Sequence, residues 1–301
     1  MTARILILDS AFPKTAPIES SLTGASFDVA VATTAYDALL LCCKGHVDLV
    51  LVDAAQTGLD AFEFCATLKR DPTLRHLPVA LMSDRTRPAL RLDALNAGAD
   101  ECLSAPFSDG LLALRMRNLA AFKALQDDQR RIAVLRGSDA FDYSCDVNLP
   151  LKVLVMDGDP RSCSRIEEIL SAECEVVCVS DDPGADCSLL GEFDVIIRDA
   201  AWPPVPEPVD PNPSRTLLLL DEGEPIPRDC RDRNVDDVLA RPVDRSELLA
   251  RVRLAGRKRR LMAQILDLDG SKVPDGRPAE PAPAPAPAPE PRSATFLRSA
   301  A

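Results

Sequence analysis

The 301-residue sequence lacks the signatures of several large protein classes. It has two histidines, His46 and His76, and none of its ten cysteines forms a Cys-x-x-Cys pair, so the ligand spacing typical of a zinc site is missing. It also has no glycine-rich phosphate loop, nucleophile elbow or catalytic histidine, and these absences disfavour an enzyme. No apolar run approaches the length that crosses a bilayer, so we predict no membrane span.

The balance of charge disfavours two further kinds of partner. The formal net charge is −12 at pH 7, whereas nucleic acids and anionic membranes need a dominant basic surface. The chain begins Met1-Thr2-Ala3-Arg4 and passes directly into an apolar segment, without a signal peptide. Several cysteines lie within apolar runs, where a reduced thiol behaves as a small hydrophobic group. We therefore expect a reduced, cytoplasmic protein with no nucleic-acid or membrane partner.

What the first 135 residues do contain is an alternation of short apolar runs and helical patterns. The runs predict strands near 3–8, 27–31, 47–52, 78–83 and 100–104. The helical patterns lie near 13–23, 34–44, 58–70, 87–97 and 107–135. Near-continuous apolar strands such as Leu49–Val52 are typical of a parallel sheet covered on both faces. The fold class is therefore α/β, with a flavodoxin-like, doubly wound sheet.

A second, eroded copy of this pattern follows. Its strands are predicted at 151–156, 174–179, 194–198, 215–220 and 236–239, and its last helix at about 244–266. Six prolines between 203 and 213 exclude a third helix there, because each proline removes a donor and clashes with the preceding turn. We expect an extended loop instead, and at most one or two helical turns in 221–235. The loop 202–213, which contains the tryptophan Trp202, could be a partner site or simply a solvent loop that replaces the lost helix.

These patterns divide the chain into four parts. We predict one domain at 1–131, a linker at 132–149, a second domain at 150–266 and a tail at 267–301. The tail contains a proline–alanine tract too poor in apolar bulk to fold, so it is predicted to be disordered. Within the last helix, six basic residues could suggest nucleic-acid binding, but we predict a solvated helix end. These are Arg251, Arg253, Arg257, Lys258, Arg259 and Arg260.

Each copy also places two aspartates directly after apolar strands. In the first copy they are Asp9 and Asp53, and in the second Asp157 and Asp199, about equally far apart. In an α/β sheet, the carboxyl ends of parallel strands meet in one crevice, where ligands bind. Two carboxylates there suit a hard divalent cation and a phosphoryl acceptor.

At these positions the chain resembles the receiver domains of two-component signalling, present here in tandem. The resemblance rests on the motifs Ala3–Asp9, Asp48–Asp53, Gly58–Phe62, Leu68–Val79, Gly98–Asp100 and Arg241–Asp244. It covers about residues 1–265 and extends to the receiver pair of PleD-type diguanylate cyclase regulators. No GGDEF-type cyclase domain follows in this sequence, so we expect no cyclase activity.

The resemblance implies roles for residues of the first copy. In a working receiver, two adjacent acids and the acceptor aspartate hold Mg²⁺, while a Ser/Thr and a Lys contact the phosphoryl group. Asp9 matches the first acid, Asp53 the acceptor and Ser83 the hydroxyl, whereas Ser10 stands where the second acid belongs. Ala105 replaces the lysine, so the cation that would stabilise an acyl phosphate is absent.

The resemblance implies a more degenerate site in the second copy. Asp157 and Asp199 remain, but Gly158 replaces the second acid, and Leu220, to within one residue, takes the hydroxyl position. Arg241 replaces the lysine and keeps its charge without the compact ammonium geometry. We therefore expect a weak Mg²⁺ site or none: Asp53 is a possible phosphoacceptor and Asp199 a vestigial one. Cys102 stands at the first copy's usual aromatic switch position.

These expectations favour a non-enzymatic regulator that acts through protein–protein contacts. By analogy it binds a histidine kinase or phosphotransfer protein and modulates it, with little dependence on its own phosphorylation. One alternative is a response regulator phosphorylated at Asp53 that switches its dimerisation or its partner binding, and a homodimer is possible. Another alternative is an enzyme of flavodoxin-like fold.

Overall fold

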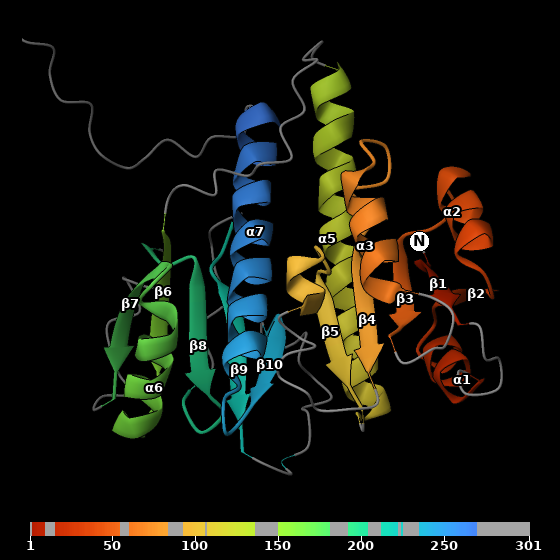
Figure 1. Ribbon diagram of the computed structural model, residues 1–301. Helices are drawn as coiled ribbons and strands as arrows, with labels where there is room; N and C mark the ends of the chain where they lie inside the picture. Colours follow the sequence, from red (N-terminus) through yellow and green to blue (C-terminus); the bar gives the residue numbers. More distant parts are fainter. Residues whose placement is uncertain are drawn as a thin grey trace, which may run out of the picture.

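In the computed structural model the strands form two separate five-stranded sheets, and every pairing within them is parallel. The described residues are 2–9, 16–54, 60–83, 93–105, 107–135, 150–180, 192–203, 212–221, 224 and 235–269. Figure 1 shows the two sheets side by side, with the helices α5 (Asp109–Leu135) and α7 (Arg245–Asp269) running together at their junction.

The first sheet has the strand order β2-β1-β3-β4-β5. Its strands are β1 (Arg4–Leu8), β2 (Asp28–Ala32), β3 (Leu49–Asp53), β4 (Val79–Ser83) and β5 (Glu101–Ser104). Its other helices are α1 (Ala16–Gly24), α2 (Ala35–Cys43) and α3 (Ala61–Arg70). This order is that of flavodoxin-like folds, in which ligands bind where the order reverses.

The second sheet repeats the same order, as β7-β6-β8-β9-β10. Its strands are β6 (Leu151–Met156), β7 (Cys174–Val179), β8 (Val195–Asp199), β9 (Arg215–Leu220) and β10 (Asp237–Ala240). The described helices of this half are α6 (Pro160–Leu170) and α7. The predicted fold class, two flavodoxin-like units in tandem, is confirmed.

Each predicted strand is present, with both ends within two residues of the prediction. The helices agree nearly as well, although α7 extends to Asp269, three residues beyond the predicted end of its domain. The predicted helix at 87–97 is described only from residue 93 onward, where it is helical up to 96. Most of the predicted loops at 203–213 and 221–235, the linker from 136 onward and the tail from 270 onward lie outside the described residues. The three boundaries between the four predicted parts remain predictions.

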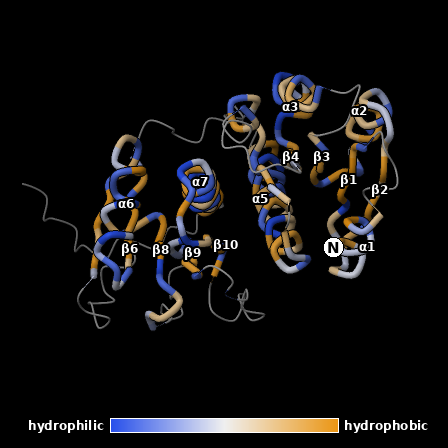
Figure 2. Tube along the Cα trace, turned by 60° about the horizontal axis from the view of Figure 1, so that its bottom comes forward, coloured by the Kyte–Doolittle hydropathy of each residue, from blue (hydrophilic) through white to orange (hydrophobic). Residues whose placement is uncertain are grey.

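Apolar side chains cover both faces of the first sheet, as a doubly wound fold requires. On one face, strand residues such as Leu6 and Val50 pack against α2 and α3. On the other, Ile7 and Leu51 pack against Leu22 of α1 and several residues of α5. In Figure 2 the hydrophobic colour concentrates on the strands, while the helices carry both hydrophobic and hydrophilic residues. Within the described parts of the chain, no helix is both long and apolar enough to cross a bilayer.

The junction between the two sheets contains two crossed sets of ion pairs. Arg115 of α5 pairs with Asp237 at the start of β10 and donates a hydrogen bond to the Val238 carbonyl (2.7 Å). Conversely, Arg251 of α7 pairs with Glu101 at the start of β5 through both of its terminal nitrogens. Glu101 and Asp237 are separated by the same number of residues as Arg115 and Arg251. The two halves therefore meet about a pseudo-two-fold axis, each through its last strand and last helix.

This junction corrects the prediction of a solvated basic helix end. Arg251 and Lys258 are 3% and 5% exposed, and they lie in the middle of α7 rather than at its end. Arg257 pairs with Asp100 (3.3 Å) and lies over the Phe122 ring, 4.7 Å from its centroid. The prediction was wrong for Arg251 and Lys258, because a charged helix facing a partner domain has the same sequence pattern as one facing water, whereas Arg253 and Arg257 are exposed.

Candidate functional site

The first acid site consists of Asp9, Asp53 and Ser83, at the carboxyl ends of three neighbouring strands. Leu8 pairs with Val52, so Asp9 lies beside Asp53; Asp53 pairs with Met82, so Ser83 stands one residue further along β4. Neighbouring strands are about 4.8 Å apart, so the three side chains belong to one cluster. Asp9 is wholly buried, Ser83 is 6% exposed and Asp53 is partly exposed.

The strand beside Ser83 contributes no cation to this site. Ser83 pairs with Ser104, and the next residue, Ala105, donates its backbone N–H to the Ser83 carbonyl (2.8 Å). The methyl group of Ala105 therefore stands where the resemblance expects a lysine. Cys102 lies within β5 and is partly exposed, and Ser10 lies outside the described residues.

The second acid site is built from Asp157 and Asp199 in the same register. Met156 pairs with Arg198, which sets Asp157 beside Asp199. Asp199 pairs with Leu219, so Leu220 occupies the place that Ser83 takes in the first site. Ala240 pairs with Leu220, and the next residue, Arg241, stands at the position of Ala105. The one-residue uncertainty in the position of Leu220 is thereby removed.

Arg241 crosses the second acid site and contacts three carboxylates. One terminal nitrogen, Nη2, lies 2.8 Å from Oδ2 of Asp157 and 2.6 Å from Oδ2 of Asp199. The other, Nη1, lies 2.9 Å from Oδ1 of Asp221, directly after β9. A side chain at the end of β10 thus reaches across β9 and β8 to the end of β6. Asp157, Asp199 and Arg241 were expected in one site from the sequence, but the third acid, Asp221, was missed.

These contacts stabilise the charged forms of the groups involved. Burial alone would raise the pKa of Asp157, but hydrogen bonds from Ser162, the Asp159 backbone N–H and Arg241 hold that pKa below its ordinary value. Burial alone would lower the pKa of Arg241, but its hydrogen bonds to Asp157, Asp199 and Asp221 raise it. Asp157 and Arg241 therefore form an internal ion pair at the centre of the second acid site.

Trp202 lies beside this cluster. Its side chain is 7% exposed and packs with Leu154, Met156 and Ile196 on one face of the second sheet. A Cβ on residue 158, where the resemblance places the second acid, would lie 3.8 Å from Nε1 of Trp202. The Trp202 side chain therefore packs against the second sheet, whereas most of the loop 202–213 lies outside the described residues, so both interpretations of that loop stay predictions.

The two sites differ in their fit to the Mg²⁺ that the family resemblance implies. Asp9 and Asp53 fit it as two adjacent carboxylate ligands, and Mg²⁺ commonly keeps several waters besides one or two carboxylates. When bound there, the ion would supply positive charge to phosphoryl oxygens. Asp157 and Asp199 do not fit it, because Arg241 is paired with both. In the described parts of the chain, no group of three or more Asp, Glu, His or Cys residues is placed to hold a metal ion.

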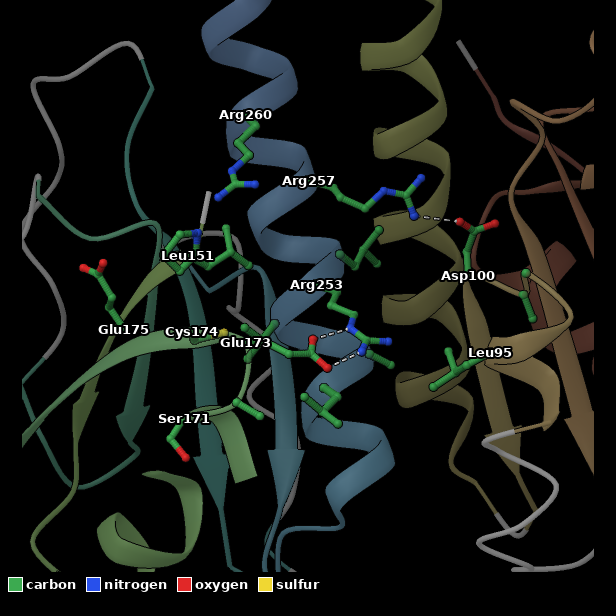
Figure 3. A pocket seen from close by; sticks show the side chains of 18 residues that line it. Leu95, Asp100, Leu151, Ser171, Glu173, Cys174, Glu175, Arg253, Arg257 and Arg260 are labelled. Atoms are coloured by element: carbon green, nitrogen blue, oxygen red, sulfur yellow. Dashed lines mark hydrogen bonds and ion pairs between the residues drawn. The ribbon is translucent and has the colours of Figure 1, made fainter. Parts of the chain in front are cut away.

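A hollow of about 810 Å³ follows the junction at the amino ends of the strands, away from both acid sites. Figure 3 shows Arg253 of α7 facing Glu173, and Arg257 reaching across to Asp100. Arg260 lines the same hollow. Since two of its three arginines are already paired with acids, we assign no ligand to it.

Comparisons with known proteins connect this geometry to a family. A family model described as the response regulator receiver domain matches residues 5–117. The chain is 30% identical over 289 residues to the response regulator PleD of Caulobacter vibrioides, covering 86% of this chain and 60% of that protein. It is 31% identical over 168 residues to the response regulator MprA of Mycolicibacterium vanbaalenii, covering 56% of this chain and 69% of that protein.

Solved structures resemble parts of the chain as well. A putative response regulator from Chloroflexus aurantiacus matches 40% of this chain and 99% of its own, at 25% identity and a TM-score of 0.39. The chemotaxis response regulator CheY4 of Vibrio cholerae matches 40% of this chain and 99% of its own, at 20% identity and a TM-score of 0.37.

Proposed function

Because the chain belongs to the response regulators of two-component signalling, we propose that it is a non-enzymatic regulator acting through contacts with other signalling proteins. Its partner is a histidine kinase or phosphotransfer protein, which it modulates with little dependence on its own phosphorylation. Since the chain spans 60% of the length of PleD, no activity of that whole protein is carried over.

The observation that carries this proposal is Ala105 at the end of β5. The register places it beside Ser83, in the position from which a lysine would reach a phosphoryl group on Asp53. A fixed cation aimed at developing charge often provides the largest single contribution to transition-state stabilisation. Its absence leaves the acceptor in place without the group that makes phosphoryl transfer efficient.

The test separates binding from phosphorylation. The full chain and its Asp53→Ala variant are added to a purified histidine kinase of the same organism, together with that kinase's own receiver and radiolabelled ATP. We expect both proteins to change phosphotransfer to the receiver equally. An effect confined to the wild type would contradict the proposal and support the phosphorylated alternative.

The alternative, phosphorylation at Asp53 that switches dimerisation, is favoured by one specific observation. Asp9, Asp53 and Ser83 occupy adjacent register positions in the first acid site, and Asp53 remains partly exposed. Incubation with Mg²⁺ and labelled acetyl phosphate distinguishes the two proposals. Under our proposal the wild type retains no more label than Asp53→Ala, whereas stable label on the wild type alone would establish the alternative.

A further inference from the structure

The carboxylate oxygens of the second acid site are already occupied by groups of the protein itself. Asp157 accepts the Asp159 backbone N–H through Oδ1 (3.0 Å) and faces Arg241 through Oδ2. Asp199 accepts the Ala201 backbone N–H through Oδ1 (2.6 Å) and the Arg241 guanidinium through Oδ2 (2.6 Å). All four oxygens that a metal ion could use therefore have partners within the chain.

A single cationic group forms the centre of this arrangement. The Arg241 guanidinium lies among Asp157, Asp199 and Asp221, which follow or end three neighbouring strands. Arginine is a suitable group here, because its planar fork carries several donors and it stays charged at every physiological pH. The site thus receives positive charge and directed donors without a dissociable ion.

We propose that Arg241 is a built-in cation that replaces Mg²⁺ in the second acid site. It neutralises the acids that a divalent ion would otherwise neutralise, and it ties the ends of β6, β8 and β9 to the end of β10. This makes the second half of the molecule independent of metal and of phosphoryl donors. The inference rests on the geometry around Arg241 and holds whether or not Asp53 of the first site is phosphorylated.

Removing the guanidinium should convert the site into one that takes up metal. An Arg241→Ala variant leaves Asp157 and Asp199, whose Oδ2 atoms both contact Nη2 of Arg241, with no cation between them. Oxygen ligands of this kind are those that Mg²⁺ and Mn²⁺ prefer. The variant should therefore gain a response to divalent ions that the wild type lacks.

The chain offers a site-specific reporter for this experiment. Trp202 is the single tryptophan, and it is packed beside the second acid site, whereas the first acid site has no tryptophan of its own. Fluorescence of the full chain, titrated with MgCl₂ and MnCl₂, should stay constant for the wild type and change to saturation for Arg241→Ala. The further substitution Asp157→Asn should weaken the response of Arg241→Ala.

The controls cover altered folding and binding elsewhere. Arg253→Ala removes an arginine from an exposed ion pair on the same half and should behave as the wild type does. Circular dichroism checks that Arg241→Ala remains folded; if it folds only when Mg²⁺ is added, that dependence itself supports the proposal. An Arg241→Lys variant, which keeps one compact charge, should respond to a smaller extent.

Two results would overturn the proposal. One is a wild type whose Trp202 fluorescence titrates with Mg²⁺ over the same range as Arg241→Ala. The other is a pair of folded variants, Arg241→Ala and Arg241→Lys, that bind neither Mg²⁺ nor Mn²⁺ at this site.

Discussion

The two acid sites share one strand register and differ in the residue that follows the last strand. Ala105 adds a methyl group beside Ser83 in the first site, whereas Arg241 contacts three carboxylates in the second. Each site keeps an aspartate where the resemblance to receiver domains expects a phosphoacceptor, but only in the second does the residue after the last strand provide a cation. An aspartate at this position therefore shows common descent with receiver domains, but it does not by itself show what the site can do. The residue after the last strand, Ala105 or Arg241, makes that difference.

Among the tests of this difference between the two sites, removing Arg241 should have the largest effect, a loss of stability. The side chain of Asp157 is 1% exposed, so Arg241→Ala leaves a buried carboxylate without its ion pair. We expect a loss of about 3 kcal/mol in the free energy of unfolding, the lower end of the range for breaking a buried pair, because Arg241 is partly exposed. Urea unfolding followed by Trp202 fluorescence measures it. Arg253→Ala should cost less than about 1 kcal/mol, and equal losses would contradict the prediction.

Supplying the missing cation to the first site should bring the next largest effect. An Ala105→Lys variant should be labelled at Asp53 by acetyl phosphate and Mg²⁺ roughly tenfold above the background shown by the wild type and Asp53→Ala, because an ammonium would face the transferred group. Ala105→Met, of similar length but uncharged, is the matched control. Labelling that rises equally with Met, or that persists in Ala105→Lys combined with Asp53→Ala, would refute this account.

A third prediction concerns the junction that holds the two halves together. Burial would raise the pKa of Asp237, but Arg115 and Arg251 hold it below its ordinary value of 3.8. A lowered pKa contributes stability that is complete above 3.8 and is lost as the pH falls through the folded-state value. The stability difference between wild type and Asp237→Asn should therefore shrink as the pH falls from 7 to below 3.8. Burial raises the pKa of Asp236, so this residue adds stability as the pH falls. Because Asp236 is present in both proteins, its contribution cancels in the difference. A difference that stays constant over this range would refute the prediction.

The smallest effect is expected at Asp199. Both of its carboxylate oxygens already accept hydrogen bonds, from Ala201 and Arg241. Introduced into Ala105→Lys, which is expected to carry label, Asp199→Ala should therefore leave acetyl phosphate labelling of the whole chain unchanged within error. A measurable decrease would show that the second acid site is chemically active.

Most of the fold could be predicted because its determinants are local. Strands such as Leu49–Asp53 are continuous apolar runs ended by an acid, and Asp60 caps α3 by accepting the backbone N–H groups of Phe62 and Glu63. The repeated order of such elements was sufficient to predict two doubly wound sheets.

What the sequence could not reveal is which distant groups meet. Arg251 resembles its solvated neighbours on α7 until Glu101, on the other sheet, is placed against it. In the same way, Asp221 looks like an ordinary residue after a strand, and Trp202 like part of a loop. Contacts across a sheet or between domains depend on tertiary geometry, which the periodicity of a helix does not predict.

The crossed pairs of Arg115 with Asp237 and Arg251 with Glu101 also have a kinetic consequence. Both partners of this pseudo-two-fold contact belong to one chain, so re-forming it is a first-order process governed by an effective concentration, not by the amount of protein present. Dilution cannot separate the halves, and a second molecule must compete against a tethered neighbour to reach these surfaces.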